Sequence, residues 1–110
     1  MAKKRIPKKI LKEVDQYVES LRQARLPIAG VYVFGSYAKG TPRQWSDIDV
    51  CVVSRRFTDA WEALRYLLKR VQPNGNPYQP TIEPIGFSPR DFREGSSLIN
   101  EIKQTGIKII

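Results

Sequence analysis

The sequence predicts an α/β (α+β) fold in which helices flank a small mixed β-sheet. Segments with apolar residues at helical spacing alternate with short runs of β-branched and aromatic residues along the chain. Such alternation is typical of domains in which helices pack on a sheet. The chain of 110 residues has room for one modest core, so we expect a single domain over residues 1–110.

The first half predicts one helix and two strands. A helix is expected over residues 7–24, where Pro7 suits the first turn, and it should end before Leu26-Pro27. Residues 28–34 and 47–53 predict strands, separated by a polar stretch. That stretch is about the shortest connection that could join parallel strands, which favours a mixed sheet over a purely parallel one.

The second half predicts a helix, an edge strand and further helical segments. The helix over residues 60–71 would be capped by Thr58 or Asp59, and its expected buried stripe consists of Trp61, Leu64, Leu67, Leu68 and Val71. Residues 73–77 form a loop by composition, and residues 81–87 predict a third strand. Because Pro84 cannot donate a backbone hydrogen bond, this strand should lie at an edge or contain a bulge.

The chain after the third strand predicts a helical turn, a helix and a tail. Ser88-Pro89 would open the turn, and Ser96 or Ser97 would cap a helix over residues 98–105. Gly106 would end that helix in the left-handed position that glycine favours. Residues 107–110 would form a short strand or a docked tail.

Composition excludes several classes of site. The chain has no histidine and one cysteine, Cys51, so it cannot build Ser-His or Cys-His nucleophiles or a typical zinc site. Any metal should therefore be a hard cation on carboxylates, which points to magnesium or manganese. A lone cysteine, no long apolar run and no secretion signal after the basic start predict a cytoplasmic protein without a membrane span.

The charge balance favours polyanionic partners. Nineteen basic and 11 acidic residues give a net charge of +8, which suits nucleotides, nucleic acid or an acidic protein surface. A solvated lysine-rich surface accounts for most of these charges equally well. A nucleic-acid-binding module remains an alternative, but the chain lacks interleaved aromatic residues and a known reader motif, so nucleic acid is not the expected partner.

Two aspartates close to the start of the second predicted strand form a candidate metal site. Asp47 and Asp49 are two positions apart, so their side chains should share one face of the strand. Two carboxylates at that distance repel each other, and a divalent cation between them would remove the repulsion. A lone Asp-x-Asp is more often a solvated strand end, so the interpretation depends on what precedes it.

A candidate phosphate site precedes these aspartates. Gly35, directly after an apolar strand, permits a sharp turn, and a helix that starts there would point its amino terminus at a phosphate. Ser36 adds a hydroxyl group, and Lys39 or Arg43 can add positive charge. A phosphate site that faces paired carboxylates is the arrangement that phosphoryl or nucleotidyl transfer needs.

The combined motif resembles that of a known superfamily. Gly35-Ser36, ten residues and Asp47-x-Asp49 are similar to the motif of the DNA polymerase beta-like nucleotidyltransferases. Within it, the chain resembles the minimal nucleotidyltransferases (MNT proteins), the antitoxins of HEPN/MNT pairs. The resemblance implies that superfamily's fold and a reaction that transfers AMP from ATP to an acceptor hydroxyl group, with two Mg²⁺ ions as cofactors.

The resemblance also assigns roles to residues. Gly35, Ser36, Lys39, Asp47 and Asp49 would bind the nucleotide. A third carboxylate on a later strand would complete a metal and catalytic set with the two aspartates, and Glu83 is the candidate by position. A glutamate that projects into solvent from an edge strand is the alternative. Asp91 and Glu94 are further candidates, although a polar helical turn at the surface explains them better.

The expected partners follow from the same resemblance. It implies that the chain modifies a helical HEPN-type protein, and we expect contact through the third strand and the last helix, either with that protein or in a homo-oligomer. An antitoxin that only binds its partner, with a degenerate site, is the alternative. Trp45 could stack on a base, but an aromatic residue of the core or its rim is the more common case.

Overall fold

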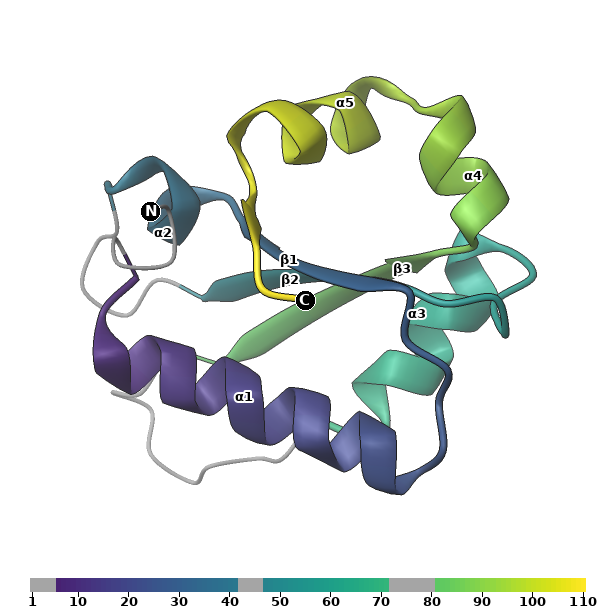
Figure 1. The fold of residues 1–110 in the computed structure, drawn as a ribbon, viewed down its shortest axis with the longest axis horizontal. Coiled ribbons are helices and arrows are strands. Elements are labelled where there is room, and N and C mark those ends of the chain that lie inside the picture. Colours follow the sequence, from purple (N-terminus) through teal and green to yellow (C-terminus); the bar gives the residue numbers. More distant parts are fainter. Residues whose placement is uncertain (1–5, 42–46, 72–80) are drawn as a thin grey trace.

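The computed structural model describes residues 6–41, 47–71 and 81–110, and it confirms the predicted alternation of helices and strands (Figure 1). In chain order the elements are α1 (Lys8–Gln23), β1 (Gly30–Phe34), α2 (Ser36–Lys39), β2 (Ile48–Val53), α3 (Ala60–Leu68), β3 (Ile82–Phe87), α4 (Pro89–Glu94), α5 (Ser97–Thr105) and β4 (Ile107–Lys108). The predicted loop at residues 73–77, and the residues Arg43 and Trp45, lie outside the described residues.

The four strands form one mixed sheet in the order β3-β2-β1-β4. Strand β1 is antiparallel to both β2 and β4, whereas β2 and β3 are parallel. A parallel pair needs a long crossover connection, and the segment that contains α3 provides it. The mixed sheet and the edge position of β3 are as predicted.

The helices cover both faces of the sheet (Figure 1). On one face, α1 and α3 enclose the larger hydrophobic cluster, to which β2 contributes Ile48, Val50 and Val52. On the other face, α4 and α5 cover a smaller cluster with Cys51 and Val53 of the same strand. Successive residues of β2 therefore serve two cores, as the alternation of side chains along a strand requires.

Helix α1 is amphipathic. Its buried residues are Ile10, Val14, Tyr17, Val18 and Leu21. The hydroxyl group of Tyr17 donates a hydrogen bond to the carbonyl oxygen of Leu67 over 2.8 Å, which ties α1 to α3 beneath the sheet. Neither α1 nor any other helix within the described ranges is long and apolar enough to cross a membrane.

Pro84 fits within β3 because its backbone groups face away from β2. The amide of Ile48 donates to the carbonyl oxygen of Thr81, and the amide of Ser54 donates to that of Phe87. Odd-numbered residues of β3 thus direct their backbone groups toward β2, and even-numbered ones direct theirs toward the free edge. Pro84 removes a donor from that edge, which disfavours pairing with a further strand.

Helix α3 is shorter than predicted, and its predicted buried stripe is wrong in part. Trp61 is 72% exposed and Leu68 is 52% exposed, whereas the buried residues of the helix are Ala63 and Leu67. The reason is the close approach of α3 to β3. A Cβ atom on Gly86 would lie 2.9 Å from both Ala63 Cβ and Leu67 Cδ1, so the helix turns its small residue toward the sheet.

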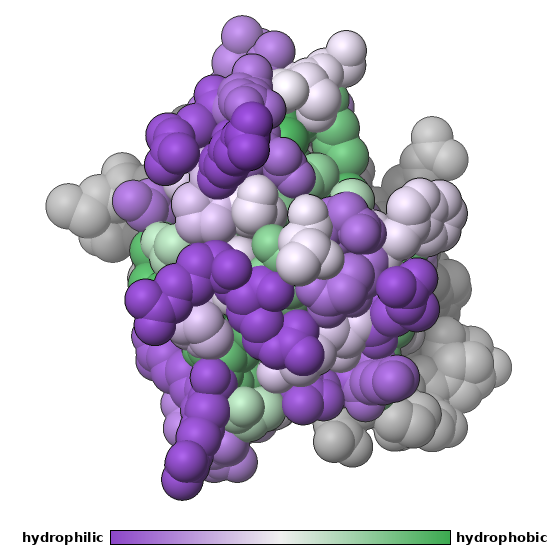
Figure 2. Space-filling view, turned by 90° about the vertical axis from the view of Figure 1, so that its right-hand side faces the viewer, coloured by the Kyte–Doolittle hydropathy of each residue, from purple (hydrophilic) through white to green (hydrophobic). Residues whose placement is uncertain are grey.

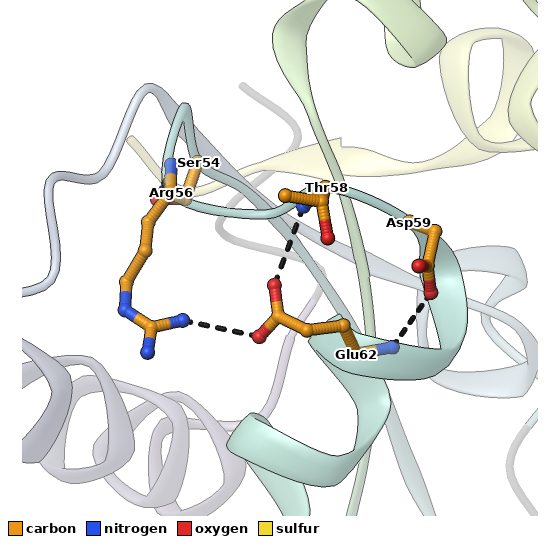
Figure 3. Close-up of polar contacts among 5 residues, drawn as sticks. All are labelled: Ser54, Arg56, Thr58, Asp59 and Glu62. Atoms are coloured by element: carbon orange, nitrogen blue, oxygen red, sulfur yellow. Dashed lines mark hydrogen bonds and ion pairs between the residues drawn. The ribbon is translucent and has the colours of Figure 1, made fainter.

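A network of polar contacts fixes the start of α3 (Figure 3). Asp59 is the cap, and its carboxylate accepts a hydrogen bond from the amide of Glu62 over 2.8 Å. The Glu62 carboxylate reaches back to the amide of Thr58 and pairs with Arg56 over 3.1 Å. The fully buried Ser54 accepts a hydrogen bond from the Arg56 amide. The contact with Asp59 satisfies an amide group that a helix start leaves without a partner, and the other contacts hold the segment before the helix in place.

The caps of the last two helices are as predicted. Ser88 accepts a hydrogen bond from the amide of Asp91, and Ser96 accepts one from the amide of Ile99. Gly106 follows α5, but its backbone is extended instead of left-handed. A Cβ atom there would overlap the carbonyl oxygen of Ile102, so close packing accounts for this glycine.

Candidate active site

Strands β2 and β3 place Asp49 and Glu83 side by side. The two residues are register partners in the parallel pair, and register partners direct their side chains to the same face of a sheet. That face is the one on which Cys51 and Phe87 pack against α5. Glu83 is exposed and Asp49 is half-buried. Glu83 does not lie on the opposite face of the sheet from Asp49, a position that would exclude it as a third metal ligand.

The carboxylates of this site interact electrostatically. Burial first, and then the hydrogen bond with Glu83, the charge of Glu83 and the charge of Asp47, together raise the pKa of Asp49 from 3.8 to about 6. Asp47 lies exposed immediately before β2. Three acidic side chains thus act on one another at this end of the sheet, and each additional negative charge makes ionisation of Asp49 less favourable.

The donor chemistry of the site fits a hard divalent cation. Carboxylate oxygens are the ligands that Mg²⁺ prefers, and a cation would relieve the unfavourable ionisation of Asp49. Within the described ranges, no group of three His, Cys, Asp or Glu side chains is placed so that it could hold a metal ion. The three carboxylates are therefore an open set, two of them exposed, and not a closed protein cage.

Gly35 lies directly against the Asp49 carboxylate. Its φ of +72° is in the region that side chains other than glycine rarely adopt. A Cβ atom on Gly35 would overlap Asp49 Oδ2 and would lie 3.1 Å from Asp49 Cγ. The antiparallel pairing of Phe34 with Asp49 explains the closeness. The predicted sharp turn is present, and it joins the phosphate half of the motif to the carboxylate half.

The helix expected after Gly35 is a single turn. It is α2 (Ser36–Lys39), and Gly40 directly after it has the left-handed conformation. Its own residues Tyr37 and Ala38 are buried. The amide groups at the start of a helix have no partner within the helix, so those that follow Gly35 are suited to bind an anion beside Asp49.

Lys39 forms an ion pair that the sequence did not predict. Its Nζ atom lies 2.9 Å from Glu101 Oε1, which links α2 to α5, and both side chains are 48% exposed. Glu101 lies 62 residues from Lys39 along the chain, so local sequence patterns do not reveal it as the partner of Lys39. Tyr37, to which the sequence assigned no role, is electrostatically linked to the site: burial, and then the charge of Asp47, raise its pKa.

The two further acidic candidates lie on α4. Asp91 is in its first turn, and Glu94 pairs with Arg90 over 3.1 Å on the exposed side of the helix. Neither is among the charges that raise the pKa of Asp49. Their positions agree with the alternative interpretation as polar residues of a surface helix.

Comparisons with known proteins find similarity over most of the chain. A family model described as a nucleotidyltransferase domain matches residues 8–107. No curated protein sequence matches the chain significantly. A candidate nucleotidyltransferase from Sulfolobus solfataricus has a similar structure, with a TM-score of 0.64, 17% identity and coverage of 91% of this chain and 78% of that one.

A second solved structure, a toxin–antitoxin complex with AMP-PNP, contains a chain that is similar with a TM-score of 0.54 and 20% identity. The match covers 87% of this chain and 71% of that one. At these identities the two solved structures establish a common fold.

Proposed function

Since the chain belongs to the nucleotidyltransferase domain family, we propose that it transfers AMP from ATP to a hydroxyl group of a protein acceptor in a Mg²⁺-dependent reaction. The observation that carries this proposal is the pairing of Asp49 with Glu83 directly beside the Gly35 turn. The acceptor oxygen forms a bond to the α-phosphorus, the bond to the bridging oxygen of the β-phosphate breaks, and pyrophosphate leaves.

The carboxylates have two tasks in this reaction. Asp47, Asp49 and Glu83 would hold the magnesium ions, which when bound supply positive charge to the phosphate oxygens. Glu83, or one of the aspartates, would accept the proton of the acceptor hydroxyl group. Because Glu83 lies on the edge strand and is exposed, an acceptor on another protein can approach it.

The turn after β1 would bind the triphosphate. The amide groups at the start of α2 and the hydroxyl group of Ser36 can donate to the β- and γ-phosphates. Lys39 would add positive charge after leaving Glu101. An ion pair this exposed contributes only about 0–1 kcal/mol, so a triphosphate, which carries several negative charges, can compete with Glu101 for Lys39.

The acceptor is proposed to be a HEPN-type toxin partner. The motif resembles that of the MNT antitoxins, and the similar fold in a toxin–antitoxin complex with AMP-PNP supports both a protein partner and an adenine nucleotide.

The buried thiol of Cys51, whose pKa burial raises to about 12, is compatible with a reducing compartment such as the cytosol.

The test is to purify the chain together with the protein that its adjacent gene encodes and to add ATP with Mg²⁺. Intact-mass measurement should show that the partner gains one AMP with the wild-type chain and none with Asp49→Asn. A stable complex without any mass gain would contradict the proposal and would favour an antitoxin that acts only by binding.

A further inference from the structure

The ion pair between Lys39 and Glu101 joins the proposed nucleotide site to a helix that has no role in the proposed reaction. Lys39 is the last residue of α2, and Glu101 belongs to α5. Lys39 Nζ lies 2.9 Å from Glu101 Oε1, and both side chains are 48% exposed. At this distance the ammonium group donates a charge-assisted hydrogen bond to the carboxylate. Glu101 therefore occupies the cation that the proposed function assigns to the triphosphate.

Lys39 lies one helical turn after the glycine that faces Asp49. Its amide donates to the carbonyl oxygen of Gly35, and a Cβ atom on Gly35 would overlap the carboxylate of Asp49. A helical turn rises about 5.4 Å, a span that a lysine side chain covers by rotation about the bonds of its four methylene groups. Lys39 is not among the charges that shift the pKa of Asp49. Glu101 thus holds the ammonium group away from Asp49, although the same group can reach a phosphate bound beside Gly35.

We propose that Glu101 is a positioning residue that competes with the β- and γ-phosphates for Lys39 and takes the ammonium group back when pyrophosphate leaves. This proposal rests on the proposed function for the identity of the ligand. Glu101 weakens the binding of ATP and of pyrophosphate, because both ligands must displace it from Lys39. It does not affect the binding of AMP, whose single phosphate lies at the α position and leaves the ion pair intact.

The exchange of partners is reversible because the ion pair is weak. A pair between two half-exposed side chains changes an equilibrium by at most about fivefold, and the released Glu101 carboxylate is hydrated at its exposed position. A triphosphate presents several negative oxygens to one ammonium group, so it displaces a single carboxylate. Once pyrophosphate has left, Glu101 is still present on the same chain at a high effective concentration, and it pairs with Lys39 again.

The experiment measures the affinity of the chain for ATP, pyrophosphate and AMP by calorimetry, with Mg²⁺ and without an acceptor protein. Glu101→Gln should bind ATP and pyrophosphate about two- to fivefold more tightly than the wild type does, and its affinity for AMP should not change. Because the side chain is exposed, the melting temperature should stay close to that of the wild type. A merely structural role of Glu101 would not produce tighter binding that is confined to polyphosphates.

A second pair of variants shows whether the effect passes through Lys39. Lys39→Gln should weaken the binding of ATP, and the addition of Glu101→Gln to this variant should change nothing further, because no ammonium group remains to compete for. Such a double-mutant cycle isolates the interaction between the two residues. If Glu101→Gln tightened ATP binding equally in both backgrounds, the carboxylate would act only as a general negative charge, and the proposal would be wrong.

Glu94→Gln is the matched control, because it removes the same charge from an exposed ion pair. Glu94 belongs to α4 and pairs with Arg90 over 3.1 Å. The side of the molecule that carries α4 is largely hydrophilic, with hydrophobic residues in small separate areas (Figure 2), so an exposed polar substitution there should be tolerated. The affinity of Glu94→Gln for ATP should equal that of the wild type, and a gain as large as that of Glu101→Gln would contradict the proposal.

The outcomes separate the role of Glu101 from the proposed function. Tighter polyphosphate binding through Lys39, together with absent AMP transfer by the wild type, would support the competition and overturn the function. Normal transfer with unchanged affinities in Glu101→Gln would overturn the competition and leave the function intact. Weaker polyphosphate binding by Glu101→Gln would show that Glu101 prepares Lys39 for the ligand, which also contradicts the proposal. A wild-type chain that binds no ATP would overturn both.

Discussion

Gly35 leaves free the space that the carboxylate of Asp49 occupies. The glycine backbone has a φ of +72°, and a Cβ atom on it would overlap Asp49 Oδ2. The motif therefore depends on a steric relationship between its two halves, which lie on neighbouring antiparallel strands. A residue with any side chain at position 35 would displace the acidic group that is proposed to bind metal.

A pair of glycine substitutions separates this steric effect from backbone strain. Gly35→Ala combines a positive φ with the overlap on Asp49, whereas Gly40→Ala has a φ of +74° and, among the described residues, no atom within 4 Å of the new Cβ. Both variants should lose about 1 kcal/mol of stability to backbone strain. Gly35→Ala should lose further stability because of the overlap on Asp49, and it should abolish AMP transfer. Chemical denaturation and mass measurement of the partner test this. Equal stability and equal activity of the two variants would contradict the steric account.

The raised pKa of Asp49 predicts how stability changes with pH in the absence of metal. The folded protein holds this proton up to a pKa of about 6, against 3.8 ordinarily. The resulting stabilisation is complete below about pH 4 and is lost as the pH rises through 6. Asp49→Asn cannot lose a proton, so its melting temperature should increase relative to that of the wild type between pH 4 and pH 7. A constant difference over this range would contradict the shift.

Magnesium should stabilise the wild-type chain at neutral pH. A cation that binds only the folded state at about a hundredfold excess over its Kd adds about 2.7 kcal/mol, and thermal melts with increasing Mg²⁺ would show the gain. Asp49→Asn and Glu83→Gln should lose most of it. Glu94→Gln, which changes the α4 carboxylate that pairs with Arg90, is the control and should keep it. An equal response of all four proteins would indicate binding elsewhere.

Because α3 packs closely on β3, we expect that Gly86 cannot be replaced by a residue with a side chain without a loss of stability. In Gly86→Ala the new Cβ would lie 2.7 Å from Phe57 Cε2 and 2.9 Å from Ala63 Cβ, and overpacking of this kind costs typically about 1–3 kcal/mol. Gly30→Ala is the matched control, because its nearest neighbour would be at an ordinary 3.4 Å. Urea denaturation should show a clear loss for the first substitution only.

Local patterns predicted much of this fold but not the contacts between distant segments. The elements that were predicted correctly depend on residues close together in the chain. They are the helix α1, the strands β1 and β2 that carry the motif, and the serine caps of α4 and α5. The buried stripe of α3 was predicted wrongly, because an apolar Trp61 does not show by itself that it faces solvent. Which side of the helix faces inward depends on Gly86, which lies 18 residues after the end of the helix.

The residues of the candidate site could also be predicted from local patterns, whereas their contacts with distant segments could not. Asp49 and Gly35 were recognisable from a motif with fixed spacing. The alternation of side chains along a strand predicts which face of β3 carries Glu83, but only the parallel register with β2 shows that this face is the one that carries Asp49. The pairing of Lys39 with Glu101 could not be predicted, because no local pattern relates α2 to α5.

The most direct test of the central claim compares ATP labelled at the α-phosphate with ATP labelled at the γ-phosphate, in the presence of Mg²⁺ and the adjacent gene's product. We expect that the α-label alone enters the partner, that pyrophosphate is released, and that Asp49→Asn and Glu83→Gln each lose most of the transfer. Entry of the γ-label would mean phosphoryl transfer, and unchanged transfer by Asp49→Asn would show that the reaction does not depend on this site.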